Sequence, residues 1–141
     1  MNRLVLDNSV TMRWLFGDGS AEDQSYAVHV LDAMESQDVE ALVPGIWALE
    51  MANVISKGES RGLLMQERSK EFLRLLFAMN IAEDPYTYSS ALSHTLDLAR
   101  RYSLSSYDAS YLELSLRRGI PLATLDRDLQ KAVELSGGSL F

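Results

Sequence analysis

Four acidic residues occupy positions where an α/β chain ends a strand or begins a helix. Asp7 and Asp126 each follow an apolar, strand-like run. Asp108 lies at the start of a helical stretch, and Glu50 lies inside another. In an open α/β sheet, ligands bind in the crevice outside the carboxyl ends of the strands. We therefore expect the four carboxylates to gather in that crevice.

Carboxylates gathered in one crevice repel each other unless a cation or a shared proton neutralises them. A hard divalent ion such as Mg²⁺ takes oxygen ligands and keeps several waters, so it suits such a cluster. Glu50 also shares a helical stripe with Asn53 and Lys57. This stripe either faces solvent or faces the crevice, where Asn53 and Lys57 would steer the carboxylate.

Each acid taken alone is also compatible with a helix cap. Asp7 and Asp126 precede helical stretches, and an Asp at the N-cap contributes about 1 kcal/mol. Asp108 follows Ser105 and Ser106, where a carboxylate favours the positive end of the helix dipole. Four such coincidences favour one shared site.

Strand-like and helix-like segments alternate along the chain, which predicts an α/β domain spanning residues 1–141. Its central sheet would be mainly parallel, with about five strands flanked by helices on both faces. The expected strands are 3–6, 40–43, 80–83, 120–125 and 139–141. The expected helices are 10–16, 22–36, 46–57, 63–79, 86–102, 107–118 and 128–135. Gly119 is expected to end the helix 107–118.

The composition sets limits on partners and location. The formal net charge of −7 lacks the basic footprint of most nucleic-acid binders. However, several negative charges would be metal ligands, and basic side chains are available locally. These basic side chains are Arg61, Arg68, Lys70, Arg74, Arg100, Arg101, Arg117 and Arg118.

The chain has no cysteine, no apolar stretch of about 20 residues and no signal-peptide pattern, which fits a cytoplasmic protein without membrane segments.

Other site chemistries fit the sequence less well. A haloacid-dehalogenase phosphatase needs a second Asp two residues after the first, where this chain has Ser9. No glycine-rich phosphate loop occurs. His29 and His94 lack paired ligand spacing, and the tyrosines near Asp108 suit packing or base stacking. The two Arg-Arg pairs are typical of solvated helix ends.

Three segments resemble the PIN-domain ribonucleases of the VapC toxin type. They are Leu4-Val5-Leu6-Asp7-Asn8-Ser9-Val10, then Trp47-Ala48-Leu49-Glu50-Met51-Ala52-Asn53, and finally the stretch from Ser105 to Leu129. The last stretch includes Ser106-Tyr107-Asp108-Ala109 and Ala123-Thr124-Leu125-Asp126-Arg127-Asp128. The segments stand in the family's order and cover most of the chain.

The resemblance implies a toxin of a VapBC toxin–antitoxin pair that cleaves RNA by metal-activated water. A cation can lower the pKa of water and stabilise charge on the transition state. The resemblance also implies a homodimer and a VapB-type antitoxin whose tail covers the active-site groove. It assigns Mg²⁺ or Mn²⁺ to Asp7, Glu50, Asp108 and Asp126, with Ser9, Asn53, Thr124 and Asp128 in support.

Two other classes of function stay open on the residues alone. One is an interaction module with an acidic metal pocket and no turnover. The other is a metal-dependent phosphatase of a small molecule.

Overall fold

A four-stranded parallel sheet forms the centre of the molecule, as a computed structural model shows for residues 2–36 and 38–141. The strand order is β3-β2-β1-β4, and every neighbouring pair is parallel. The mainly parallel sheet is thus confirmed. The strands are β1 (Arg3–Leu6), β2 (Glu40–Val43), β3 (Ile81–Glu83) and β4 (Leu122–Ala123).

The predicted fifth strand at 139–141 is wrong, since this segment makes only a single bridge between Leu122 and Leu140. The fourth strand is also shorter than the predicted range 120–125. Pro121 has no N–H to donate to a neighbouring strand, although its carbonyl accepts from the N–H of Val5 at 2.9 Å. Beyond Ala123 the backbone turns out of the sheet toward the acidic residues.

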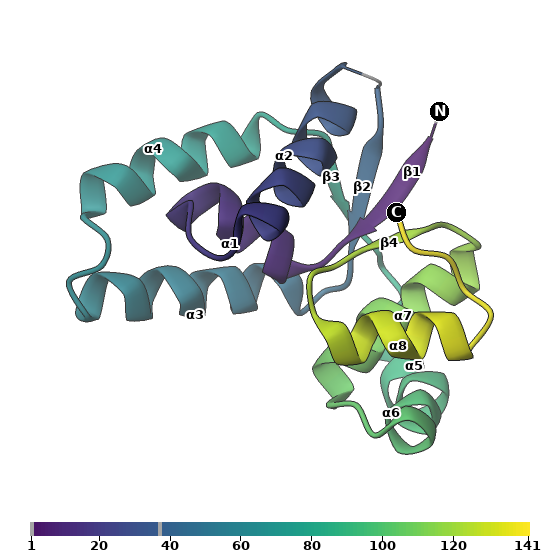
Figure 1. Ribbon diagram of the computed structural model, residues 1–141. Helices are drawn as coiled ribbons and strands as arrows, with labels where there is room; N and C mark the ends of the chain where they lie inside the picture. Colours follow the sequence, from purple (N-terminus) through teal and green to yellow (C-terminus); the bar gives the residue numbers. More distant parts are fainter. Residues whose placement is uncertain (1, 37) are drawn as a thin grey trace.

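Helices cover both faces of the sheet, as predicted (Figure 1). On one side lie α1 (Asn8–Phe16), α2 (Ala21–Ser36), α3 (Trp47–Ser60) and α4 (Gln66–Phe77). On the other lie α5 (Thr87–Ser90), α6 (Leu96–Tyr102), α7 (Ser106–Arg118) and α8 (Arg127–Leu135). The predicted helix 86–102 is helical, but a π-helical turn (Ala91–Thr95) interrupts it.

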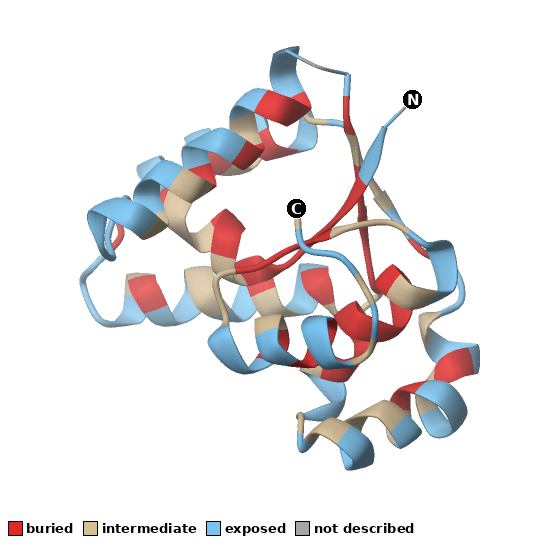
Figure 2. Cartoon of the chain, turned by 45° about the vertical axis from the view of Figure 1, so that its right-hand side comes forward, coloured by how far each residue is buried: buried red, intermediate tan, exposed pale blue. Residues whose placement is uncertain are grey.

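The apolar runs that predicted the strands form the core (Figure 2). Leu4, Val5 and Leu6 are fully buried, because β1 lies between two strands and beneath helices on both faces. Gly119 ends α7 in the left-handed conformation at φ 64°, as its position predicted. Among the described residues, no helix is long and apolar enough to cross a membrane.

Candidate active site

Asp7 lies directly beyond β1, and only 6% of its surface is exposed. One carboxylate oxygen, Oδ2, accepts hydrogen bonds from the hydroxyls of Ser9 (2.6 Å) and Thr124 (2.7 Å). Asp7 occupies the N-cap position of α1, but its side chain makes no capping hydrogen bond. The carboxylate is therefore held by the hydroxyls of Ser9 and Thr124 and does not act as a side-chain cap of α1.

The two hydroxyls also fix the loop that follows β4. The N–H of Leu125 donates to Ser9 Oγ at 2.9 Å, and the N–H of Asp126 donates to Thr124 Oγ1 at 3.0 Å. These backbone donors are used for the site, so they cannot extend β4. The structure thus joins Asp7, Ser9, Thr124 and the backbone of Asp126 in one network.

Glu50 reaches the same region from the first turn of α3. Its Oε1 accepts a hydrogen bond from the hydroxyl of Tyr111 at 2.5 Å. The pKa of Glu50 is raised overall. Partial burial raises it most, and the hydrogen bond from Tyr111 offsets part of that increase. Tyr111 was expected to pack, and it is fully buried, but its hydroxyl also contacts a candidate catalytic acid. No hydrogen bond links Glu50 to Asn53 or Lys57 among the described residues; both line a cavity farther along α3.

Asp108 lies in the first turn of α7, where its N–H donates to the capping hydroxyl of Ser105 at 3.1 Å. The pKa of its carboxyl rises to about 6, mainly through burial and then through the charges of Asp126, Asp7 and Glu50. Asp108 therefore lies close enough to each of the other three acids to be repelled by its charge. The structure brings together the carboxylates of all four predicted site acids.

Asp126 has a second role at the start of α8. Its Oδ1 accepts a hydrogen bond from the N–H of Leu129 at 2.9 Å, so it caps this helix. The capping interpretation and the cluster interpretation both describe this residue. Asp128 lies two residues further along the chain and is exposed, and it contributes to none of the pKa shifts of the other acids.

The chemistry of the four side chains suits a hard cation, but their present arrangement suits it less well. None of the four acids forms a salt bridge within the described part of the chain, and their donor atoms are all oxygens. Within residues 2–36 and 38–141, however, no three His, Asp or Glu side chains are arranged to hold a metal ion. A cation would have to draw the side chains inward or contact some of them through water.

Asn8 is a candidate residue that the sequence analysis missed. It is 5% exposed, and its Nδ2 donates to the carbonyl of Trp47 at 3.3 Å. Its Oδ1 is buried and has no hydrogen-bond partner among the described residues. The same side chain helps to lower the pKa of Glu50, so it lies beside the cluster. An unpaired buried oxygen here fits a site that receives a cation or its water.

A second charge cluster lies on the other side of α7 and adds to one expectation. Arg117 is an exposed residue in the last turn of α7, as expected, and its guanidinium also binds Asp84 through two bonds of 3.1 and 2.6 Å. It also binds Glu113 at 2.7 Å and lies 5.5 Å from the ring centre of Tyr86. These carboxylates raise the pKa of Arg117. The spacing of Glu113 and Arg117 could have indicated their pairing.

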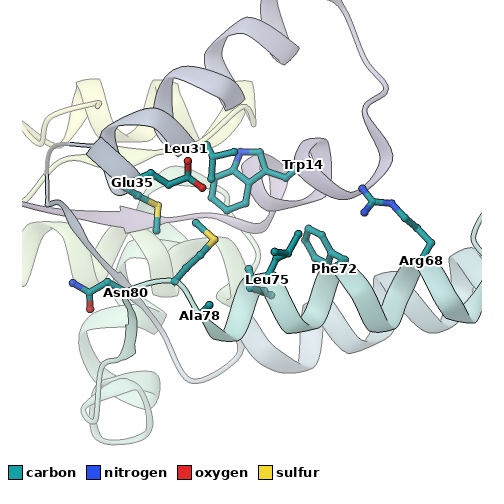
Figure 3. A pocket seen from close by; sticks show the side chains of 11 residues that line it. Trp14, Leu31, Glu35, Arg68, Phe72, Leu75, Ala78 and Asn80 are labelled. Atoms are coloured by element: carbon teal, nitrogen blue, oxygen red, sulfur yellow. The ribbon is translucent and has the colours of Figure 1, made fainter.

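The acidic cluster is separate from an apolar cavity of about 510 Å³ between α1, α2 and α4. Figure 3 shows Trp14, Leu31, Phe72 and Leu75 around this cavity. The indole N–H of Trp14 donates to the carbonyl of Ala27 at 2.8 Å, which fixes the ring. None of the four site acids lines this cavity.

Comparison with known proteins identifies the class. Residues 4–135 match the PIN domain family, so the chain belongs to that family. The chain is 28% identical over 127 residues to a protein of Pyrobaculum aerophilum named "Ribonuclease VapC3". That alignment covers 90% of this chain and 92% of the relative.

Solved structures share the fold. The crystal structure of PAE2754 from Pyrobaculum aerophilum has a TM-score of 0.66 and 19% identity, covering 99% of this chain and 88% of the other. The crystal structure of FitAcB from Neisseria gonorrhoeae has a TM-score of 0.62 and 16% identity, covering 98% and 96%. A structure of FitAB bound to an IR36 DNA fragment has the same score and identity, covering 98% and 93%.

Proposed function

We propose that this chain is a metal-dependent endoribonuclease and the toxin of a type II toxin–antitoxin pair. The observation that carries the proposal is the convergence of four carboxylates at the carboxyl edge of a PIN-family sheet. The name of the relative, Ribonuclease VapC3, supports RNA as the substrate. Asp7, Glu50, Asp108 and Asp126 would hold Mg²⁺ or Mn²⁺.

The cation, when bound, would lower the pKa of a water molecule and stabilise negative charge on the phosphate. The chain's own groups prepare the site for it. Ser9 and Thr124 donate to one oxygen of Asp7, which fixes the direction of the other oxygen. Tyr111 does the same for Glu50. These hydrogen bonds limit the directions in which the carboxylates of Asp7 and Glu50 can turn.

The proposal includes a VapB-type antitoxin and a homodimer. An Arg side chain from the antitoxin would pair with two carboxylate oxygens of the acidic cluster and replace the cation. The net charge of −7 favours a basic partner segment. Co-purification from the native host should yield a small partner; recovery of an unpartnered protein that is fully active and harmless to cells would contradict this part.

One experiment separates the proposed nuclease from the two alternatives. Purified protein is incubated with RNA, with DNA and with a phosphate monoester, each with Mg²⁺ or with EDTA. Cleavage of RNA only with Mg²⁺ supports the proposal. Hydrolysis of the monoester alone indicates a phosphatase, and absence of turnover indicates an interaction module.

Binding of the cation has its own test, because melting temperature reports it without activity. A ligand at about 100 times its dissociation constant stabilises the fold by roughly 2.7 kcal/mol. A Mn²⁺ titration should raise the melting temperature of the wild-type protein. An unchanged melting temperature over a wide range of Mn²⁺ would count against the metal site.

A further inference from the structure

A basic cavity of about 350 Å³ lies along α1 and α3, the two helices that carry Ser9 and Glu50 in their first turns. Arg13 lies on α1 and Lys57 lies on α3. Arg61 is the C-cap residue directly after α3. Asp18 is the one carboxylate among its lining residues. This local excess of positive charge stands out in a chain whose net charge is −7.

The cavity is connected with the acidic cluster through both helices. Glu50, Asn53 and Lys57 fall on one stripe of α3, and the last two line the cavity. Lys57 lies about 10 Å from Glu50 along the helix axis. On α1, Ser9 contacts Asp7, and Arg13 follows one turn later. The two helices contact each other and both begin at the site (Figure 1).

Arg13 has unused hydrogen-bonding capacity in this cavity. Its Nη2 pairs with Asp18 at 3.2 Å, and 19% of its side chain is exposed. Its Nε is buried without a hydrogen-bond partner among the described residues. Lys57 and Arg61 are exposed and form no salt bridge within the described part of the chain. A buried unpaired donor is costly, so it indicates a missing acceptor.

We propose that this cavity, which we call the α1–α3 groove, binds a backbone phosphate of single-stranded RNA adjacent to the scissile one. The inference rests on the proposed nuclease function and names a substrate contact for it. Arg and Lys side chains bind phosphate oxygens through charge-assisted hydrogen bonds. Phosphate contacts fix the register of a strand without reading its sequence. The groove would thus align the strand so that the next phosphate meets the carboxylates.

Anisotropy of a fluorescent single-stranded RNA, measured in EDTA over a salt series, tests the groove without requiring cleavage. The variant is Lys57→Gln/Arg61→Gln. The matched control is Lys70→Gln/Arg74→Gln, which removes the same charges with the same spacing on exposed positions of α4. Each single-strand phosphate contact contributes a slope of about 0.7 in log affinity against log salt.

Loss of two contacts should lower that slope by about 1.4 and weaken binding about 25-fold at about 0.1 M salt. The control should bind as the wild type does. Equal losses in both variants, or wild-type binding by both, would overturn the groove. Displacement of the RNA by oligo-glutamate at equal charge concentration would overturn the assignment to RNA, since a carboxylate peptide would then suffice.

The outcomes also separate this inference from the nuclease proposal. If the wild type cleaves RNA while Lys57→Gln/Arg61→Gln binds normally, the groove fails and the nuclease stands. If the wild type never cleaves RNA but the groove variant alone loses salt-dependent binding, the nuclease fails and the groove stands.

Discussion

The hydroxyl of Tyr111 donates a hydrogen bond of 2.5 Å to the carboxylate of Glu50, joining α7 to α3 across 61 positions of the chain. Tyr111 is fully buried, and burial together with Glu50 raises its pKa, so the hydroxyl keeps its proton and serves as a donor. One half-buried acid of the candidate site is thereby held in a fixed direction. The relationship makes Tyr111 a positioning residue for Glu50.

We predict that Tyr111→Phe keeps the ring packing but destabilises the metal-free fold by about 1.5 kcal/mol, because Glu50 loses a donor. The pKa of Glu50 should rise further, since the Tyr111 hydrogen bond lowers it. Mn²⁺ should then be needed at higher concentration to raise the melting temperature. Urea unfolding and Mn²⁺ thermal shift measure both effects. Tyr107→Phe, at an exposed position of the same helix, is the control and should match the wild type.

The pH dependence of stability should reveal the raised pKa of Asp108, which moves from 3.8 to about 6. The folded protein binds this proton more tightly than the unfolded chain. The resulting stability is therefore complete below about pH 4 and is lost as the pH rises through about 6.

In EDTA, Asp108→Asn should become more stable than the wild type as the pH rises through about 6, and the difference should then level off. Unfolding free energies at a series of pH values measure it. A difference between the two proteins that does not change with pH would show that Asp108 carries no raised pKa.

Asp126 combines a cap with a cluster charge, so two substitutions should separate the roles. Asp126→Ser keeps a good N-cap oxygen for Leu129, whereas Asp126→Ala removes it at a cost of about 1 kcal/mol. Both remove the charge. We expect both variants to lose RNA cleavage and only Asp126→Ala to lose stability. Cleavage by Asp126→Ser at the wild-type rate would limit Asp126 to capping.

The sequence predicted the strands best where one apolar run determined them. Residues 3–6 and 40–43 match β1 and β2 because each run is buried and is followed by a residue that leaves the sheet. The run 120–125 was misleading, because the backbone N–H groups of Leu125 and Asp126 donate to Ser9 and Thr124. An apolar run does not show where the backbone N–H groups leave the sheet to bond with side chains of the site.

The positions of strand ends and helix starts in the sequence predicted which carboxylates belong to the site. They did not predict the contacts that these carboxylates make. The bond between Tyr111 and Glu50 depends on how α7 packs against α3, which no local pattern encodes. The unpaired oxygen of Asn8 depends on the carbonyl of Trp47, which lies 39 positions away. Both features require the three-dimensional arrangement.

Arg117 should be important for stability although it lies outside the acidic cluster. The side chain of Asp84 is fully buried, and Arg117 neutralises it. Arg117→Ala would leave that charge unpaired, at a cost of about 3–5 kcal/mol. Arg118→Ala, at the exposed neighbouring position, should change stability by less than about 0.5 kcal/mol. Chemical denaturation of both variants tests the difference.

The rate of RNA cleavage by Asp108→Asn at saturating Mn²⁺ tests the central claim most directly. The amide is nearly isosteric with the carboxylate, and the cap hydrogen bond at Ser105 uses only the backbone N–H. A folded variant should therefore lose at least about 100-fold in rate, because it lacks an anionic oxygen for the cation. A folded Asp108→Asn variant that cuts RNA at the wild-type rate would contradict the account.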